Sequence, residues 1–568
     1  MREHLRAWLD HNTDRIRQAG AALAEGAPAN ISAANWASWC QTNLVAHINE
    51  AVTGGHVGHP ALSQRLAETG LLPMFGFPTR VRYLHLTRPY QAYPWPPPHV
   101  VDRDLAMAVS QFAPLSELVR DGRIYPVVGV AAFRPTRPKP RPEDDPMGIA
   151  RRVEVCRSCS YVEEPPENAP AQDGPCPRCS AAPGVFQSVD MREPLGFRAG
   201  HSRDFNGEFS WSARAMAGRA LTGLDSLRPV PIAAAIAHSG PGKRFVINDN
   251  GGKLFRFRPA VPSTHGDWGG YVAVDAVEKD LLSPSSCTGE PISVALGSVQ
   301  PTDFLFLGPA EPVLHETGLR LNLDNSRRQP RGPAETLDAR RGAWYSLAFL
   351  LRTVAAAQLD IQELELIGGI YSGVRHDVST TFAFLADTLE NGAGFSTHLG
   401  EPDVLAELLD NVEDYLRVLN QPAHATDCSA SCYKCLRDYS NMAYHALLDW
   451  RLAGDLFQLL RGRPLPDSRQ RENAILAKWA QAYGGSLIPG LPAAAALWEH
   501  PADGRFAVVA RHPLEAAEHG LIAQRLAETL KTLETTVPAT DGVVFADSFT
   551  LDRDPGRVLA MFTEAHKP

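Results

Sequence analysis

Apolar positions repeat along this chain with a period that changes from one region to the next. Residues 1–70 carry charged sequences with helical spacing, interrupted by loop-forming stretches at GAPANIS and TGGHVGHP. The end of LLPMFGFPTRVRYLHL alternates apolar and polar residues, which is typical of a β-strand. Between about 190 and 310 strand patterns dominate. There KRFVINDNGGKLFRF predicts a hairpin, because Asn248–Gly252 suits the positive φ angles of a tight turn.

The period becomes helical in the second half of the chain. In AWYSLAFLLRTVAAAQL, Ala343, Leu347, Leu351 and Val354 share one helical face. Helices are expected to continue to about residue 465. A final segment then alternates helix and strand, with RFAVVARHPL and DGVVFADSF as its buried strands. The sequence therefore predicts a multidomain α+β protein with a β-rich middle.

The length of 568 residues exceeds what a single hydrophobic core organises, so several domains are expected. Changes of pattern divide the chain into six segments. These are a helical entry segment (1–75), a mixed segment with proline-rich loops (76–150), a four-cysteine zinc ribbon (151–190), a β-rich domain (191–334), a helical zinc-binding domain (335–465) and a small α/β C-terminal domain (466–568).

The composition is that of a soluble globular protein, with 44% hydrophobic and 21% charged residues. The N-terminal sequence MREHLRAWLDHNTDRIRQAG is charged and lacks the apolar stretch of a signal peptide. No apolar run approaches the roughly 20 residues that a membrane-spanning helix needs. We therefore expect a cytoplasmic protein without a membrane partner.

The formal net charge of −9 means that the surface as a whole does not attract nucleic acid, although a local basic patch suffices for binding. Two basic tracts are candidates for such a patch, and solvated proline-rich linkers are the alternative interpretation of both. The candidate nucleic-acid-binding residues are Arg134, Arg137, Lys139 and Arg141 in FRPTRPKPRP, and Arg327, Arg328 and Arg331 in NSRRQPR.

Seven of the nine cysteines fall in two clusters, which favours metal binding over disulfides in a reducing compartment. The first cluster comprises two Cys-x-x-Cys pairs, Cys156/Cys159 and Cys176/Cys179, separated by 16 residues. Each pair can form a tight knuckle that presents both sulfurs to one ion, and two knuckles complete a tetrahedral zinc ribbon. Such a closed site is structural, because no coordination position remains for water.

The second cluster lies in CSASCYKCLRDY and consists of Cys428, Cys432 and Cys435. Tetrahedral zinc needs a fourth ligand. We favour His445, because a helix over NMAYHALLDWRLAGDLF would point its imidazole back at the sulfurs, although a helix-face histidine without a ligand role is also open. Cys287 is the next candidate, and His424, Asp427 and Cys40 are further ones. Two structural zinc ions per chain are therefore expected.

The second cluster also carries a family resemblance. The string CSASCYKCLRDYSNMAYHALLDWRLA resembles the MrfA-like zinc-binding domain that ends many bacterial superfamily 2 helicases. The strings LLPMFGFPTRVRYL, DRDLAMAVSQFAP, GFRAGHSRDFNGEFSW and FLADTLENGAGF resemble the sequence that leads into this domain in large anti-phage defence helicases, the Druantia type among them. The resemblance covers about residues 60–465. The MrfA type has a fourth cysteine nearby, and this chain does not.

The sequence contains no helicase motor. It has no GxxxxGK[ST] phosphate loop and no DEAD- or DEAH-like string, and SGPGKRF has the wrong spacing, with no Ser or Thr after Lys243. We therefore expect no ATPase activity from this chain alone. By resemblance it corresponds to the part of such a helicase that follows the motor, either encoded separately or cut from a longer protein.

The resemblance implies a helicase-associated zinc-binding module that helps a superfamily 2 motor bind DNA, in prokaryotic anti-phage defence or DNA repair. The expected partners are a motor subunit, or missing N-terminal motor domains, and DNA in single-stranded form. Two alternatives stay open. One is a scaffold that binds only protein, and the other is a nuclease in the C-terminal segment that uses Asp547, Asp552 and Asp554 of VVFADSFTLDRDP.

Overall fold

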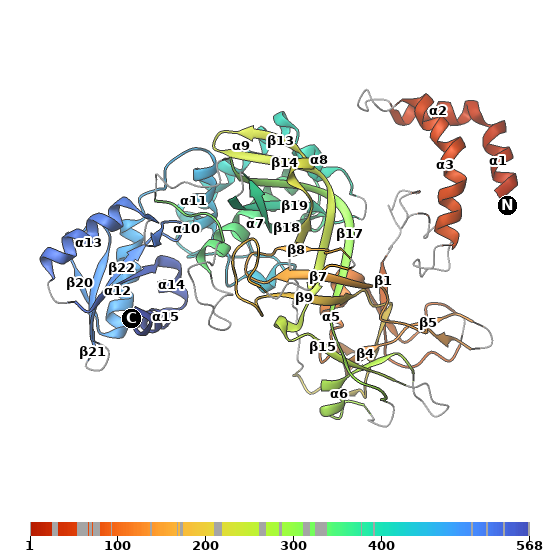
Figure 1. Cartoon of the computed structure of the whole chain (residues 1–568), viewed down its shortest axis with the longest axis horizontal. Coiled ribbons are helices and arrows are strands. Elements are labelled where there is room, and N and C mark those ends of the chain that lie inside the picture. Colours follow the sequence, from red (N-terminus) through yellow and green to blue (C-terminus); the bar gives the residue numbers. More distant parts are fainter. Residues whose placement is uncertain are drawn as a thin grey trace.

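The computed structural model of the chain is a mixed α+β structure built around a large β-sheet (Figure 1). This confirms the predicted fold class. No helix in the described part of the chain is long and apolar enough to cross a membrane. The structure describes residues 2–24, 32–53, 66, 71, 80–91, 94–136, 139–166, 168–170, 174–208, 219–260, 268–282, 287–310, 318–323, 338–375, 378–389, 392–500, 504–518, 521–537 and 540–565.

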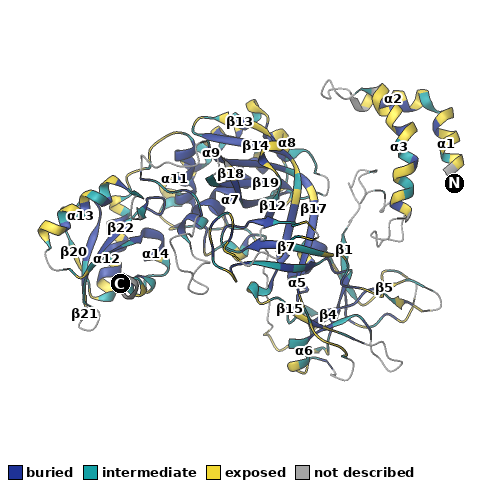
Figure 2. Cartoon of the chain, viewed as in Figure 1, coloured by how far each residue is buried: buried dark blue, intermediate teal, exposed yellow. Residues whose placement is uncertain are grey.

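Three helices pack against one another at the N-terminus (Figure 1). A small core of side chains that includes Leu9, Ile16 and Cys40 holds them together. Most of the remaining surface of these helices is exposed (Figure 2). The helix expected near residues 60–70 lies largely outside the described residues. The three helices are α1 (Arg2–His11), α2 (Thr13–Ala24) and α3 (Ala33–Thr53).

Two long strands, β14 (Ala235–Asn248) and β17 (Ile292–Pro309), form the centre of the large sheet. They pair antiparallel along the whole of β14, and β17 pairs in addition with β9, β15 and β19. The other strands of this sheet are β1 (Val81–His85), β2 (Val100–Asp104), β3 (Glu117–Arg120), β4 (Arg123–Val130), β7 (Ala150–Cys156), β8 (Val162–Glu163), β9 (Phe186–Arg192), β10 (Gly196–Ala199), β11 (Arg203–Asp204), β12 (Arg219–Leu221), β13 (Arg228–Ile232), β15 (Phe255–Pro259), β16 (Tyr271–Ala273), β18 (Leu366–Arg375) and β19 (Val378–Asp387).

The prediction of a hairpin in KRFVINDNGGKLFRF is wrong. Strands β14 and β15 both pair antiparallel with β17, with Asn248 opposite Leu296 and Phe255 opposite Val294, so the two strands run in the same direction. The residues between them form a 3-10 turn in which Gly251 has a φ of 66°. The residues between β14 and β15 therefore form a bulge. After it, the chain continues in the same direction along β17 and does not turn back.

The main hydrophobic core lies between the sheet and a layer of helices (Figures 1 and 2). Helix α7 (Ala339–Leu359) packs on β18 and β19, and the apolar face predicted for it is buried. Helices α9 (Pro402–Leu419) and α11 (Trp450–Leu460) pack in turn on α7. The cysteines of both clusters belong to this same core.

The C-terminal segment forms a second sheet with its own core. Its strands β22 and β25 are the two buried strands that the sequence predicts, and they run parallel, as a helical crossover requires. The elements here are α12 (Arg469–Tyr483), β20 (Ser486–Ile488), β21 (Ala495–His500), β22 (Gly504–Arg511), β23 (Ala517–Glu518), β24 (Leu521–Ile522), α13 (Gln524–Thr536), β25 (Gly542–Asp547), α14 (Ser548–Arg553) and α15 (Arg557–Ala565).

Several short elements connect these layers. They are α5 (Leu105–Gln111), β5 (Phe133–Arg134), β6 (Arg141–Pro142), α6 (Val274–Glu278), α8 (Phe395–Leu399) and α10 (Pro422–Ala425), with 3-10 turns at Leu224–Ser226, Asn250–Gly252, Glu363–Glu365 and Met442–Tyr444.

Candidate metal centres

The first cysteine cluster sits on two tight turns of the same geometry. In each turn the amide of the first cysteine donates to the carbonyl of the residue five positions later, at 2.9 Å after β7 and at 2.8 Å in the second turn. The serine that follows each pair adopts the left-handed backbone conformation, with a φ of 60° at Ser160 and 56° at Ser180. The repeated Cys-x-x-Cys-Ser sequence thus forms the same knuckle twice, and the four sulfurs face one centre.

The four sulfur atoms have the separations that a tetrahedral ion requires. Cys156 Sγ lies 3.6 Å from Cys179 Sγ, and Cys159 Sγ lies 3.8 Å from Cys176 Sγ. A tetrahedron with metal–sulfur bonds of about 2.3 Å has edges of about 3.8 Å, whereas a disulfide would bring two sulfurs to about 2.0 Å. The four cysteines are free thiols and can hold one metal ion.

The first cluster is closed to solvent. None of its four cysteines is more than 2% exposed. Burial raises the pKa of the Cys159 thiol well above its ordinary value, because a lone thiolate is poorly solvated there. A bound cation reverses this preference, since a coordinating thiol is deprotonated. With four sulfur ligands and no access for water, such a centre is structural and not catalytic.

Hydrogen bonds from three distant elements hold the first cluster in the core. Buried Arg219, at the start of β12, donates to the Cys156 carbonyl at 2.6 Å. Ser372 on β18 donates its hydroxyl to the Cys159 carbonyl at 2.7 Å. The Tyr345 hydroxyl of α7 lies 3.1 Å from the hydroxyl of the serine that ends the first knuckle. A metal ion here therefore fixes the point where ribbon, sheet and helix α7 meet.

The second cluster is completed by His424. Its Nε2 atom lies 3.6 Å from Cys432 Sγ, while Cys428 Sγ lies 3.9 Å from Cys435 Sγ. All four ligand atoms lie within 4.8 Å of one another. A tetrahedral ion with bonds of about 2.3 Å to sulfur and about 2.0 Å to nitrogen would separate these two atom types by about 3.5 Å. The cluster can therefore hold a metal ion through three sulfurs and one nitrogen.

The chain before the cysteines orients the imidazole. The short helix α10 begins with Pro422 directly after α9, and it brings Nδ1 of His424 to 2.9 Å from the Leu419 carbonyl. Because a carbonyl only accepts, Nδ1 carries the proton and the lone pair of Nε2 faces the sulfurs. Metal-binding histidines are commonly fixed in this way by a hydrogen bond from the other ring nitrogen.

The loop that carries the second cluster is tied to helix α11. Backbone amides of Cys432 and Lys434 donate to cluster sulfurs at 3.1 and 3.4 Å, which favours the thiolate form. Arg451, in the first turn of α11, donates to the carbonyls of Ala425 and Cys428, each at 3.0 Å. These contacts hold the ligands on both sides of the centre in place.

His445, the expected fourth ligand, lies elsewhere. Its Nε2 atom is 3.0 Å from the Asp438 carbonyl and 2.9 Å from Asn441 Oδ1. The physical reason is that α11 begins only after Asp449, whose carboxylate caps it, so the residues before it form a 3-10 turn and not the expected helix. Within the described part of the chain, the other candidates also stay outside the cluster, namely Cys40, Cys287 and Asp427.

The first basic tract lies among acidic neighbours. Arg134 in β5 donates to Glu143 at 2.6 Å, so part of its charge is neutralised. Lys139 and Arg141 are exposed. Outside the described residues lie Arg137 and the whole of the second tract, Arg327, Arg328 and Arg331.

The carboxylates considered for a nuclease do not form a cluster. Asp547 ends β25 and caps α14, accepting from the Thr550 amide at 2.8 Å, and it pairs with Arg511 at 3.6 Å. In the described part of the chain, only the two cysteine clusters gather three or more metal-ligating side chains, so Asp552 and Asp554 do not join Asp547 in a metal site.

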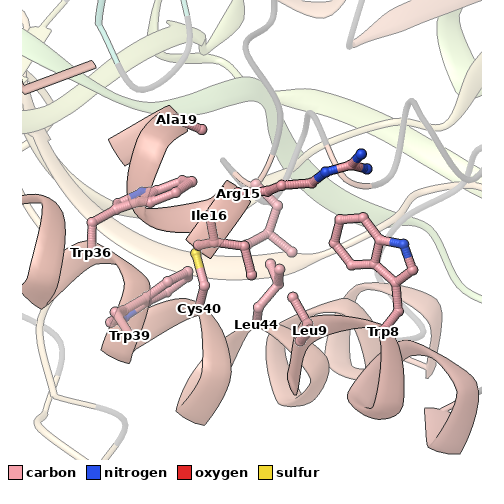
Figure 3. Close-up of a pocket in the computed structure, with 10 residues that line it drawn as sticks. Trp8, Leu9, Arg15, Ile16, Ala19, Trp36, Trp39, Cys40 and Leu44 are labelled. Carbon is pink, nitrogen blue, oxygen red and sulfur yellow. The ribbon is translucent and has the colours of Figure 1, made fainter. Parts of the chain in front are cut away.

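An apolar cavity of about 630 Å³ opens between helices α1, α2 and α3 (Figure 3). Trp8, Trp36 and Trp39 line it together with Arg15, its only charged wall in the described residues. The three tryptophans remain between 36% and 53% exposed. Exposed aromatic surface of this kind is typical of an interaction site.

Similarity to known proteins is found among solved structures. No protein-family model matches the sequence, and no curated protein matches it. Among solved structures, the chain is similar to the crystal structure of the DUF1998 helicase MrfA bound to DNA, with 10% sequence identity and a TM-score of 0.27. The alignment covers 64% of this chain and 32% of that chain. A TM-score this low carries no information about the fold or the function of this chain.

Proposed function

We propose that this chain is a helicase-associated zinc-binding module that helps a superfamily 2 motor bind DNA. The observation that carries the proposal is the second metal centre. The segment whose sequence resembles the MrfA-like zinc-binding domain brings three cysteines and one histidine to tetrahedral spacing. His424 supplies the ligand that the fourth cysteine supplies in the family.

Zinc is the metal that both ligand sets favour. Four thiolates, or three thiolates with one imidazole, in a closed tetrahedral arrangement are typical of structural zinc. In this proposal the ligands are Cys156, Cys159, Cys176 and Cys179 for one ion, and His424, Cys428, Cys432 and Cys435 for the other. Both ions belong to one hydrophobic core, so each stabilises the same folded unit.

The six segments of the sequence remain a proposal about domain organisation. One structural feature bears on it: the ribbon is joined to its surroundings, because β9 pairs with β17 and β7 pairs with β9 in the large sheet. The ribbon therefore stiffens the β-rich part and does not hang from it on a linker.

The role toward DNA in this proposal is to position it. Basic side chains hold phosphates, and exposed aromatic ones stack on unpaired bases. Lys139 and Arg141 are available for phosphate contacts, since both are exposed. Resemblance to defence helicases suggests the setting, in which a motor subunit or N-terminal motor domains supply ATP hydrolysis for anti-phage defence or repair.

A protein-only scaffold is the second candidate function. The tryptophan-lined cavity on α1–α3 favours it, because exposed tryptophans are enriched where proteins bind one another. The two candidates differ in whether this chain contacts nucleic acid at all.

Elemental analysis and DNA binding test the proposal. Purified chain is expected to contain two zinc ions, and one ion or none would contradict the two-centre assignment. Fluorescence anisotropy with a labelled single-stranded oligonucleotide is expected to show binding at low salt that weakens as salt is added. No binding, with or without a superfamily 2 motor protein added, would leave the scaffold as the remaining candidate.

A further inference from the structure

Two tyrosines project from the loop that carries the second metal centre. Tyr433 is 70% exposed and Tyr439 is 64% exposed, which places them among the most exposed aromatic side chains that the structure describes. A single exposed aromatic residue needs no explanation. Two exposed tyrosines on one short loop form an aromatic surface, because each ring offers a flat π-face on which another ring can stack.

His445 contacts the ring of Tyr433 and the backbone next to Tyr439. The ring of Tyr433 meets the ring of His445 edge-on, with centroids 5.6 Å apart and an interplanar angle of 83°. On its other side, His445 Nε2 lies 3.0 Å from the carbonyl of Asp438, the residue before Tyr439. His445 thus fills the space beneath the loop and supports Tyr433, a positioning role in place of the ligand role that the sequence suggested.

The loop is held in one conformation before any partner binds. Tyr433 lies between the ligands Cys432 and Cys435, whose sulfurs accept backbone amides of the loop. Further along, the side-chain amide of Asn441 donates through Nδ2 to the Leu436 carbonyl at 2.8 Å. A preorganised surface loses little conformational entropy on binding, so exposed rings here can contribute more to affinity than rings on a mobile loop.

The charge next to the rings suits a phosphate backbone. Lys434 is exposed directly beside Tyr433, and Arg437 lies half-buried two residues before Tyr439. The carboxylate of Asp438 is already paired with buried Arg352. Arg352 also pairs with Glu363 at 3.2 Å, and zinc with three thiolates would carry one formal negative charge, so positive and negative charges around the loop balance. Exposed Lys434 is therefore the cation that can reach a phosphate beside the rings.

We infer that Tyr433 and Tyr439, with Lys434 beside them, form a stacking platform for the unpaired bases of a single-stranded nucleic acid. The inference rests on the proposed function and names where on the chain the strand is held. Bases in a duplex are stacked on each other and are closed to such a platform, whereas every unpaired base has a π-face for a tyrosine ring. Contact through stacking and phosphate charge predicts little sequence preference.

The test compares variants of the full, zinc-loaded chain on a labelled oligo-dT strand. Tyr433→Ala and Tyr439→Ala are each expected to weaken binding at least about five-fold, as removal of a base–aromatic stack does. Tyr433→Phe and Tyr439→Phe keep the ring and are expected to bind like the parent chain. Tyr90→Ala is the matched control, because Tyr90 is 63% exposed but lies between β1 and β2. Zinc content is measured for every variant.

A second readout reports stacking itself. An oligonucleotide with 2-aminopurine changes its fluorescence when that base stacks. The change is expected with the parent chain and with the Phe variants, and it is expected to be lost in the Tyr433→Ala/Tyr439→Ala double variant. A parallel series with oligo-U distinguishes single-stranded DNA from RNA as the ligand. If the tyrosine variants lose affinity equally for oligo-U and oligo-dT, the platform binds either nucleic acid. If they lose affinity for oligo-dT alone, the platform is specific for DNA.

The outcomes separate this inference from the proposed function. If the parent chain binds oligo-dT and the double Ala variant binds equally well with both zinc ions present, the platform is refuted while DNA binding stands. If the parent chain does not bind oligo-dT at low salt, the proposed function fails, and the platform fails with it. If Tyr90→Ala weakens binding as much as Tyr433→Ala and Tyr439→Ala do, the assignment is also overturned.

Discussion

His424 decides whether the second centre is complete. His424→Ala removes the nitrogen ligand, and three sulfurs alone are expected to lose the ion, so zinc content falls from two ions per chain toward one. His424→Cys supplies a fourth thiolate in place of the imidazole, and it is expected to retain two ions. Elemental analysis of the purified variants measures both effects.

His445→Ala is the matched control for that experiment. It removes an imidazole from the same loop, but its nitrogen contacts Asp438 and Asn441 and no sulfur. Zinc content is therefore expected to stay at two ions per chain. A loss of zinc in His445→Ala with retention in His424→Ala would reverse the assignment of the fourth ligand.

The sequence could locate the sulfurs but not the nitrogen. Cys-x-x-Cys spacing fixes sulfur positions locally, because a tight turn over the two intervening residues brings both side chains to the same side. The imidazole depends on where helices begin and end. Two signals point to His424: Pro422 starts a new helix just before the cysteines, and Asp449 is a strong N-cap that starts α11 too late for His445.

His85 makes the stability of the β-rich part depend on pH. It is only 2% exposed in β1, and burial lowers its pKa to about 4. The unfolded chain, with a pKa near 6.5, therefore binds a proton that the folded chain excludes, and stability falls as the pH drops from 6.5 toward 4. The expected loss between pH 7 and 5 is about 2 kcal/mol.

Denaturant unfolding of the parent chain and of His85→Leu at pH 7 and pH 5 measures how much of the pH-dependent loss of stability comes from His85. The variant is expected to lose less stability than the parent over the same interval, while His201→Leu, at an exposed histidine, should behave like the parent. Equal losses in all three proteins would show that His85 is not responsible for the pH dependence.

Elements were predicted well where their pattern is local. The apolar face of α7 and the buried strands β22 and β25 follow from periodicity alone, because each buries one contiguous set of side chains. The hairpin failed because its turn signal is local whereas strand pairing is not. The long strand β17 offers partners to both β14 and β15, and this pairing extends along the whole of β14.

Helices α12 and α13 are joined by a buried charge network. Arg525 of α13 donates to fully buried Glu472 of α12 at 2.7 and 2.8 Å, and it also pairs with Glu515. Arg525→Met would leave two carboxylates without their counter-ion, and loss of one partner of a buried pair costs about 3–5 kcal/mol. Arg525 is 22% exposed, so we expect the lower end, about 3 kcal/mol.

Hydrogen exchange in α12 and α13 measures this cost without requiring the whole chain to unfold in one step. Exchange in both helices is expected to become faster in Arg525→Met and to be partly restored when Glu472→Gln and Glu515→Gln are added, because neutral amides need no counter-ion. Unchanged exchange in the single variant would mean that the network does not stabilise the C-terminal unit.

The whole molecule combines one hydrophobic core, which contains both candidate metal centres, with a negative net charge. The net charge of −9 repels DNA at long range, so binding must be confined to a face where basic side chains outnumber carboxylates. The acidic neighbours of the first basic tract restrict that face further, because Glu143 takes part of the charge of Arg134. Few phosphate contacts are therefore expected, and stacking must supply much of the affinity.

The salt dependence of single-strand binding tests this balance. With about 0.7 units of slope per phosphate contact, a slope of log affinity on log salt of about −2 to −4 is expected. Lys139→Ala with Arg141→Ala should make the slope shallower by about 1.4, since both side chains are exposed and free to reach phosphates. Removing the aromatic rings of Tyr433 and Tyr439 should lower affinity at every salt concentration and leave the slope unchanged. A steep slope of about −8 or beyond would mean that phosphate contacts dominate and that the binding face is far more basic than these residues make it.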